Sequence, residues 1–328
     1  MMNETVMQHT PTNQTTPTGG PRLLGAGRKV SIIGAPCGFG ASIAGVDLGP
    51  AVLRVARLNQ RIAQLGYEVR DLGDIRLECP KQLASPPDKT KYLREITAAC
   101  QQLCSEVLSI LRDGEIPLVL GGDHSIAVGT ASGVASFYHE RNQAIGLLWF
   151  DAHADMNTPE TSPTGNIHGM PLACLLGYGV PGLTHIGGFA PKLDPRFCAH
   201  IGARDVDGGE RELIRRLGIR FITMREIDER GMSTCMDEAI AIATKAPAGY
   251  HVTLDVDALD PGDAPGSGTV VRGGLTYREA HLAMEKIAEA GGMLSFEVVE
   301  INTALDINNR TAQLGVELIL SALGKTIL

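Results

Sequence analysis

The sequence has few aromatic residues and lacks any long run of apolar ones. Aromatic side chains make up 4% of the 328 residues, and there is a single tryptophan. No apolar stretch approaches the roughly 20 residues that a helix needs to cross a lipid bilayer, so we expect no membrane partner. Positive charge is also in deficit, because the formal net charge is −8. We therefore expect no nucleic-acid partner.

The cysteines follow no recognisable spacing. The seven are Cys37, Cys79, Cys100, Cys104, Cys174, Cys198 and Cys235. Because their number is odd and no C-x-x-C pair occurs, the sequence predicts neither a disulfide framework nor a zinc knuckle. Reduced thiols are typical of the cytoplasm, which is the location we expect.

The N-terminal stretch differs in composition from the rest of the chain. Residues 1–28 are rich in Thr, Gln, Asn, Pro and Gly. They lack the apolar core of a signal peptide and the arginine density of a transit peptide. We therefore expect a disordered tail over 1–28 and one folded domain over 29–328.

From Lys29 onward, short apolar runs alternate with helical periodicity. Strands are predicted over 29–36, 67–73, 116–122, 144–150, 184–189, 200–205, 219–224, 249–257 and 291–302. Helices are predicted over 50–65, 91–112, 171–176, 209–217, 232–244 and 310–323, with others after Ser125 and Thr276. This alternation favours parallel strands joined by crossover helices. The expected fold class is therefore α/β, with a mainly parallel sheet of about eight strands.

Acidic residues and imidazoles stand at the ends of four predicted strands. They are His124, Asp151, His153, Asp155, Asp255, Asp257 and Glu300. In a parallel sheet, functional groups gather beyond the carboxyl ends of the strands. On an extended backbone, alternate side chains point the same way. We therefore expect Asp151, His153 and Asp155 to converge on one point.

Such a cluster of carboxylates and imidazoles needs a cation to hold it together. Two histidines and four aspartates can serve two divalent ions if some carboxylates bridge them. Two ions about 3.5–4 Å apart would hold a bridging hydroxide as a nucleophile. The ligand types favour manganese and leave iron, cobalt, nickel and zinc open.

Each motif taken singly has a plainer interpretation. Asp123 and His124 could cap the following helix, and an Asp-x-Asp at a strand end is often a loop of solvated acids. The joint occurrence of these motifs at four strand ends favours the metal site over these alternatives.

Six motifs, in order along the chain, resemble those of the ureohydrolase family, and most closely those of its arginases. They are GGDHS (121–125), DAHADMN (151–157), GNIHGMP (165–171), LDVDALDP (254–261), GGLTYREA (273–280) and EINTALD (300–306). The resemblance implies one three-layer α/β/α catalytic domain over 29–328 with two Mn²⁺ per subunit. It also implies hydrolysis of L-arginine to L-ornithine and urea, a step of arginine metabolism and the urea cycle, by a homotrimer or homohexamer.

The resemblance also assigns roles to the strand-end residues. One ion would be held by His124, Asp151, Asp155 and Asp255, and the other by Asp151, His153, Asp255 and Asp257. Glu300 would pair with the guanidinium group, and Asp155 would pass a proton to the leaving amine. His168 would be a proton shuttle; the alternative is an ordinary loop histidine.

A further set of residues resembles the family's contacts to the far end of the substrate. Those near the α-carboxylate would be Asn157, Ser162, Thr164 and Asn166, those near the α-ammonium Asp207 and Glu210, and Thr269 joins the substrate-binding set. Asp207 and Glu210 also suit a helix N-terminus. Pro163, Val270 and the loop 37–45 depart from the family pattern, which bears on substrate preference.

Three rival functions stay open. The first is an agmatinase, or another guanidino-compound ureohydrolase with the same binuclear centre. The second is a nucleotide-binding α/β protein with a vestigial site, although Ile43 occupies the third glycine position of G-x-G-x-x-G and the fingerprint fails. The third is deacetylase chemistry on a related fold, which would use one metal and fewer ligands; the ligands for a second metal speak against it.

Overall fold

Eight strands form a single sheet in the computed structural model, which describes residues 27–78 and 88–326. The strands are β1 (Lys29–Ala35), β2 (Glu68–Asp74), β3 (Ile116–Gly121), β4 (Gly146–Phe150), β5 (Cys198–Ala203), β6 (Arg220–Thr223), β7 (Tyr250–Asp255) and β8 (Met293–Val299). Residues 1–26 of the expected tail lie outside the described residues.

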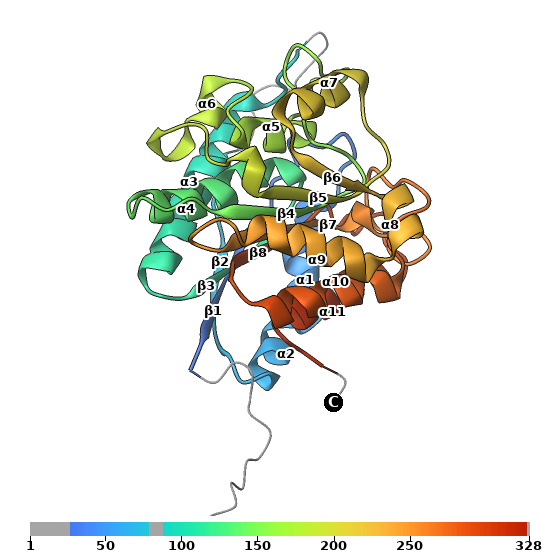
Figure 1. The fold of residues 1–328 in the computed structure, drawn as a ribbon. Coiled ribbons are helices and arrows are strands. Elements are labelled where there is room, and N and C mark those ends of the chain that lie inside the picture. Colours follow the sequence, from blue (N-terminus) through green and yellow to red (C-terminus); the bar gives the residue numbers. More distant parts are fainter. Residues whose placement is uncertain (1–26, 79–87, 327–328) are drawn as a thin grey trace, which may run out of the picture.

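All neighbouring strands of this sheet run parallel. Their order is β2-β1-β3-β8-β7-β4-β5-β6. Parallel neighbours require crossover connections, and most of the helices lie in those connections (Figure 1). The predicted α/β class with a parallel sheet of about eight strands is confirmed.

The helices form two layers, one on each face of the sheet (Figure 1). One layer consists of α1 (Gly49–Val55), α2 (Leu58–Gln64), α8 (Met224–Arg230), α9 (Met232–Ala243), α10 (Tyr277–Ala290) and α11 (Arg310–Ala322). The other consists of α3 (Leu93–Arg112), α4 (Ala127–His139), α5 (Pro171–Leu175), α6 (Pro181–Thr184) and α7 (Gly208–Leu217). The expected three-layer α/β/α arrangement is therefore present.

Strand β4 shows why both faces of the sheet must be covered. Leu148 and Phe150 pack into the hydrophobic cluster on one face, whereas Leu147 and Trp149 pack into the cluster on the other. All four side chains are fully buried. Because side chains alternate along a strand, an all-apolar strand is apolar on both faces. Burial of each large side chain contributes about 1.5–3 kcal/mol, which drives helices onto both sides.

The predicted strand over 184–189 is wrong. These residues lie in the end of α6 and in a short 3-10 turn over Ile186–Gly188. Gly187 and Gly188 have φ angles of 80° and 88°, which belong to the left-handed region and not to an extended strand. The two adjacent glycines permit that conformation and end any strand there.

Two helical predictions also need correction. The helix expected over 50–65 is interrupted at Arg57, whose φ angle is 64°, and it forms α1 and α2 instead. Apolar spacing runs on across the break, so periodicity could not locate it. Helix α8 was not predicted, although Thr223 and Glu226 form a capping box at its start.

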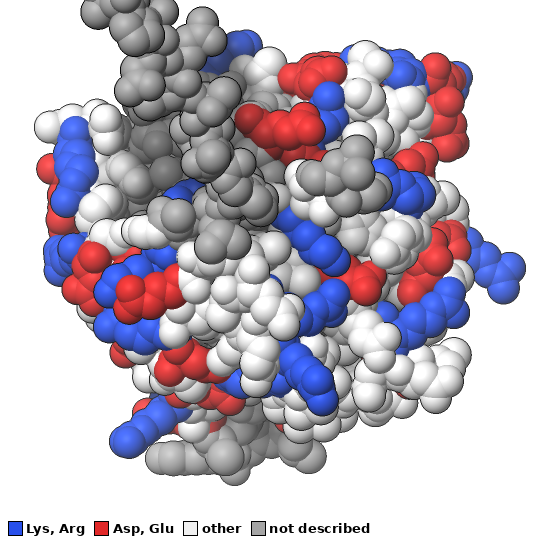
Figure 2. Space-filling model, turned by 90° about the horizontal axis from the view of Figure 1, so that it is seen from below, with Lys and Arg blue, Asp and Glu red and all other residues white. Residues whose placement is uncertain are grey.

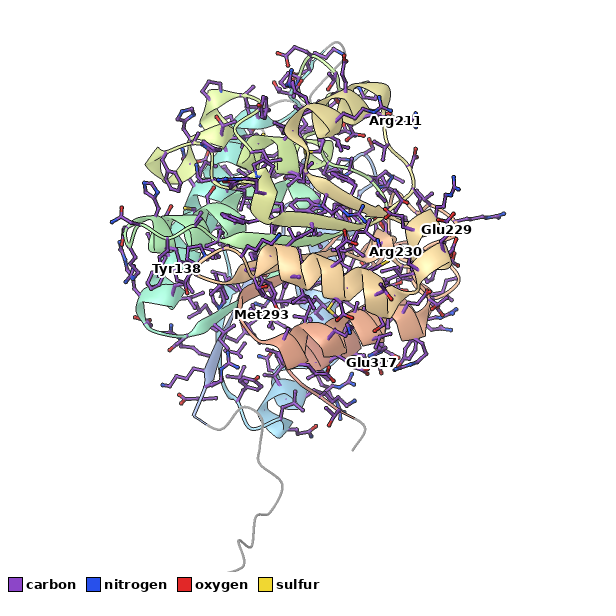
Figure 3. All side chains as sticks on the ribbon, in the orientation of Figure 1. Tyr138, Arg211, Glu229, Arg230, Met293 and Glu317 are labelled. Atoms are coloured by element: carbon purple, nitrogen blue, oxygen red, sulfur yellow. The ribbon has the colours of Figure 1, made fainter. Side chains whose placement is uncertain are left out.

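A charged network joins β6, α8 and α9 at the surface. Arg220 pairs with Glu226 and Glu238 at 2.6 Å each, and Arg230 pairs with Glu238 at 2.6 Å. Figure 3 labels Arg230 beside Glu229 on α8. On the face shown in Figure 2, basic and acidic side chains are interspersed over the described residues.

Among residues 27–78 and 88–326, the structure has no helix with the length and apolarity that a membrane crossing requires.

Candidate functional site

Four neighbouring strands end in residues that the sequence singles out. Strands β3, β8, β7 and β4 lie side by side in that order. His124 closely follows β3, Glu300 follows β8, Asp255 ends β7 and Asp151 follows β4. Because neighbouring strands lie about 4.8 Å apart, parallel pairing brings these distant parts of the sequence to one edge.

The same kind of turn follows two of these strands, β4 and β7. Oδ1 of Asp151 accepts a hydrogen bond from the backbone N–H of His153 at 2.7 Å. Oδ1 of Asp255 accepts one from the N–H of Asp257 at 2.8 Å. These Asx turns redirect the backbone, and the second oxygen of each aspartate faces His124.

After β3, helix capping accounts for Asp123 but not for His124. Oδ1 of Asp123 accepts a hydrogen bond from the N–H of Ser125 at 3.0 Å, so Asp123 caps the following 3-10 turn. The side chain of His124 instead lies against three carboxylates.

We expected an extended backbone to bring Asp151, His153 and Asp155 together, and this was wrong in part. The extended strand ends at Phe150, and Asp155 has a φ angle of 53° in the left-handed region. Asp151, His153 and Asp155 do lie close together, but the Asx turn and the left-handed Asp155 bring them there. Asp257 likewise lies in a 3-10 turn after β7.

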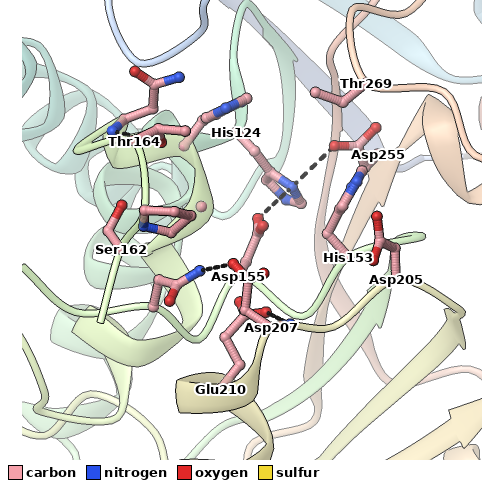
Figure 4. A pocket seen from close by; sticks show the side chains of 15 residues that line it. His124, His153, Asp155, Ser162, Thr164, Asp205, Asp207, Glu210, Asp255 and Thr269 are labelled. Atoms are coloured by element: carbon pink, nitrogen blue, oxygen red, sulfur yellow. Dashed lines mark hydrogen bonds and ion pairs between the residues drawn. The ribbon is translucent and has the colours of Figure 1, made fainter. Parts of the chain in front are cut away.

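His124 is the centre of the first group of potential ligands. Its Nδ1 lies 3.1 Å from Asp151, 3.1 Å from Asp155 and 3.3 Å from Asp255. Its ring stacks on Trp149, with centroids 4.2 Å apart. Figure 4 shows His124, Asp155 and Asp255 pointing toward one another.

The second group shares Asp151 with the first. Nδ1 of His153 lies 3.0 Å from Asp257 and 3.5 Å from Asp151. Potential ligand atoms of Asp151, His153 and Asp257 lie within 4.8 Å of one another, as do those of His124, Asp151 and Asp155. All six residues expected at the metal centre are therefore gathered in two adjoining groups.

The chemistry of this cluster fits a bound cation. One imidazole nitrogen cannot hydrogen-bond three carboxylates, and both Nδ1 of His124 and Oδ2 of Asp155 lack a hydrogen-bond partner among the described residues. Burial, and then the negative charge of Asp151, raises the pKa of Asp155 to about 8. Burial alone would lower the pKa of His124, but the surrounding carboxylates raise it well above its usual value. Divalent ions take such nitrogen and oxygen ligands and would balance this negative charge.

A pocket opens above the cluster (Figure 4). All seven expected substrate contacts line it, together with Asp155 and His168 from the expected catalytic set. Ser162 and Thr164 lie on one wall, whereas Asp205, Asp207 and Glu210 lie toward the other.

Glu300 does not line the pocket, unlike the other two expected catalytic residues. Its side chain is 2% exposed, and Oε1 accepts a hydrogen bond from the backbone N–H of His124 at 2.9 Å. The same oxygen lies 2.9 Å from Nδ1 of His168. Burial opposes the charged form of His168, but the Glu300 carboxylate raises the pKa of His168 to about 9.

The acidic wall is held together by local hydrogen bonds. Glu210 accepts from the backbone N–H groups of Met156 at 3.0 Å and Asp207 at 2.7 Å, which caps α7. Burial raises the pKa of Glu210 to about 7. Nδ2 of Asn157 donates to Asp207 at 2.9 Å. The helix N-terminus interpretation therefore holds for both acids, because Asp207 is the N-cap of α7 and Glu210 lies in its first turn, and both also line the pocket.

Thr269 serves the metal cluster as well as lining the pocket. Its hydroxyl donates to Oδ2 of Asp257 at 2.9 Å. This hydrogen bond orients a potential metal ligand.

Three residues of the site were not predicted from the sequence. Nε1 of Trp149 donates to Asp151 at 3.0 Å, and Oγ1 of Thr253 lies 3.0 Å from Nε2 of His124. Asp205 lines the pocket. Trp149 and Thr253 each stand two positions before a strand-end aspartate, on the same face of the strand. That period of two was the available signal.

The fold and the site together define an α/β protein with a carboxylate–imidazole cluster that could hold metal ions, as in metal-dependent hydrolases. The model of the Arginase family matches residues 28–324. The chain therefore belongs to the arginase family of hydrolases, which confirms the resemblance drawn from its motifs.

Individual relatives agree with this assignment. The chain is 48% identical to arginase from Brevibacillus brevis over 301 residues, which cover 92% of this chain and 99% of that protein. It is 47% identical to arginase from Bacillus caldovelox over 302 residues, covering 92% and 100%. The native structure of the Bacillus caldovelox protein superposes with a TM-score of 0.87. A structure of a hypothetical agmatinase from Burkholderia thailandensis is 22% identical, covers 93% of this chain and 86% of that one, and has a TM-score of 0.70. At this level of identity the similarity shows a shared fold alone.

Proposed function

We propose that this protein hydrolyses L-arginine to L-ornithine and urea. The family assignment and the similarity to two named arginases support this activity. The observation that carries it is the placement of the His–Asp cluster at the base of a pocket whose upper walls hold hydroxyl and amide groups on one side and carboxylates on the other. Such a pocket matches a guanidinium group at one end and an amino-acid group at the other.

The metal centre is proposed to hold two Mn²⁺ ions. The residues that would hold one ion are His124, Asp151, Asp155 and Asp255, and those that would hold the second are Asp151, His153, Asp255 and Asp257. Bound ions would supply the nucleophile, because coordination lowers the pKa of water. The shared position of Asp151 in both groups supports a bridging role for it.

The remaining steps belong to side chains of the chain itself. Glu300 would orient the guanidinium group by charge pairing. Because Oε1 already accepts from the N–H of His124 and faces His168, Oε2 would make this contact. Asp155 would carry a proton to the leaving amine, since an amine cannot leave as an anion. The side chain of His168 is 17% exposed and contacts Glu300, so it would exchange protons between the site and solvent.

Recognition of the amino-acid end is assigned to the two walls. Donors on Asn157, Ser162, Thr164 and Asn166 would bind the α-carboxylate. Asp207 and Glu210 would bind the α-ammonium group. Thr269 is kept in the substrate-binding set through its position in the pocket lining.

Agmatine is the principal alternative substrate. It carries the guanidinium and an ammonium group but no carboxylate, so it would leave the donor-bearing wall unused. The alternative therefore differs from the proposal at one wall of the pocket only.

One assay decides between them. Urea release from L-arginine and from agmatine is measured with manganese added and again after chelation. Ornithine and urea formed from L-arginine, lost on chelation and regained with manganese, support the proposal. Putrescine formed from agmatine without turnover of L-arginine would overturn the substrate assignment, and no urea from either after manganese loading would overturn the activity.

Family membership also leads us to propose a cytoplasmic homotrimer or homohexamer that acts in arginine metabolism and the urea cycle. Light scattering coupled to size exclusion measures the subunit number directly. The division into a tail over 1–28 and a catalytic domain over 29–328 likewise stays a prediction.

A further inference from the structure

Both the oxygen and the nitrogen of the Asn166 side-chain amide, in the pocket wall, are hydrogen-bonded. Its Oδ1 accepts a hydrogen bond from Nζ of Lys91 at 3.0 Å. Its Nδ2 donates to Oγ of Ser42 at 2.6 Å. Lys91 and Ser42 come from segments far from Asn166 in the sequence, so the tertiary fold sets the orientation of this amide.

The chemistry of lysine allows only one orientation of this amide. An ammonium group has three donors and no acceptor. It can therefore hold only the oxygen of the Asn166 amide, and the nitrogen must lie on the opposite side. One of the two N–H groups of Nδ2 is used by Ser42, and the second is left as a donor. Asn166 lines the pocket, and the proposal made below assigns this donor to an anionic group there.

The segment that carries Lys91 is packed tightly against the same wall. The backbone N–H of Lys91 donates to the carbonyl oxygen of Gly165 at 3.0 Å. A Cβ atom on Gly165 would lie 2.2 Å from the carbonyl oxygen of Asp88, and Gly165 has a φ angle of 76°. This close contact requires glycine and fixes Lys91 relative to the wall over 162–166.

A second ammonium group lies behind the same wall. Nζ of Lys89 donates to the carbonyl oxygen of Ser162 at 3.0 Å. Two positive charges thus support the wall over 162–166, whereas Asp205, Asp207 and Glu210 lie toward the other wall (Figure 4). The lining itself carries negative charge, and these lysines contact its residues Ser162 and Asn166. Charges of both signs therefore lie near the pocket, as a substrate bearing both an α-carboxylate and an α-ammonium group would need.

We propose that Lys91 is a specificity-determining positioning residue. It holds the Asn166 amide with its nitrogen as the donor and places positive charge behind the wall that faces the α-carboxylate. It thereby favours guanidino substrates that carry a carboxylate over those that lack one. The inference rests on the proposed function and adds to it a residue outside the pocket lining.

The test compares two ligands that differ in the carboxylate alone. L-ornithine and putrescine are titrated as inhibitors of the manganese-loaded enzyme, and their binding is also measured by calorimetry. For Lys91→Met we expect L-ornithine to bind about tenfold more weakly, the loss of one charge-assisted hydrogen bond. Putrescine binding should stay within about twofold, and KM for L-arginine should rise more than kcat falls. Lys91→Arg, which keeps the charge and the donors, should recover most of the ornithine affinity.

Controls separate this role from a structural one. Lys89→Met removes a nearby charge without freeing the Asn166 amide and should weaken L-ornithine binding less than Lys91→Met does. Lys286→Met removes a lysine that pairs with Asp237 on the helical surface and should change the binding of neither ligand. If Lys91→Met does not fold, Lys91→Gln, which keeps a donor and loses the charge, undergoes the same comparison.

Two outcomes would overturn the inference. Equal weakening of L-ornithine and putrescine would show that Lys91 only maintains the loop, and unchanged binding of both would show that it has no role. A wild-type enzyme that neither hydrolyses L-arginine nor binds L-ornithine would overturn the proposed function itself, which is a different result from a variant that fails to discriminate.

Discussion

Replacement of Thr253 by valine should weaken one metal site and spare the other. Thr253 is fully buried on β7, and its Oγ1 lies 3.0 Å from Nε2 of His124. For Nδ1 of His124 to bind a metal ion, the imidazole proton must reside on Nε2. Thr253 is the acceptor placed to hold that proton. Valine keeps the shape of threonine but removes the acceptor.

The size of the effect follows from burial. Both groups are excluded from water, so Thr253→Val leaves a buried N–H unpaired at a cost of about 1–3 kcal/mol, which corresponds to roughly 5- to 150-fold in affinity. Loss of an outer partner of a metal-binding histidine typically costs about 10–100-fold. We therefore expect about 10–100-fold weaker binding at the site that contains His124. The site that contains His153 and Asp257 should change much less.

Calorimetric titration of the apoprotein with Mn²⁺ measures the two sites separately. Thr253→Ser keeps the hydroxyl and should restore most of the affinity. Ser132→Ala is a matched control, since its hydroxyl is buried in α4 without a hydrogen-bond partner among the described residues. Wild-type affinity at both sites in Thr253→Val would refute the tautomer argument, and so would equal weakening at both.

Three further predictions concern the cluster, the pocket and the surface. His124→Ala should lose about one metal ion per subunit and most turnover; unchanged metal content would remove His124 from the ligand set. Asp207→Ala should raise KM for L-arginine about tenfold with full metal content, and unaltered kinetics would exclude Asp207 from recognition. Hydrogen bonds from Arg220 lower the pKa of Glu238 to about 2, so its stabilising contribution is present above the unfolded pKa near 4.3 and is lost as pH falls toward 2. Because Glu238 is partly exposed, Glu238→Gln should cost only about 1 kcal/mol at pH 7 and almost nothing near pH 2, and denaturant unfolding that gave a pH-independent difference would contradict this sign.

The sequence predicted the parts of the fold that depend on hydrophobic pattern. Segments such as 116–122 and 144–150 are apolar throughout, and in this fold only buried parallel strands suit them. It failed where a single backbone dihedral decides the outcome. Arg57 and Asp155 both have positive φ angles, yet neither is a glycine, and nothing in the local composition marks the helix break at one or the turn at the other.

The residues of the candidate site could likewise be predicted only in part. Strand-end acids could be found because chain position after an apolar run is visible in the sequence. The partners that orient them, Thr253 and Trp149, are ordinary core residues by composition. The contact of Trp149 with Asp151 follows the period of two along one strand, whereas the contact of Thr253 with His124 depends on how separate segments pack. Lys91 lies still further from any signal, because its contact with Asn166 spans 75 positions and depends on how two loops pack.

The family departure at Pro163 gives this contact added weight. Pro163 lines the pocket where the resemblance to arginases leads us to expect a hydroxyl, and proline has neither a side-chain donor nor a backbone N–H. The wall toward the α-carboxylate therefore relies on its remaining donors. Ser162 already accepts from the N–H of Gly165, and Thr164 from the N–H of Asn166, so the loop uses these hydroxyls as acceptors for its own backbone. Each of these hydroxyls still has its own O–H to donate. With the donor at 163 absent, the orientation that Lys91 imposes on Asn166 gains importance for distinguishing arginine from agmatine.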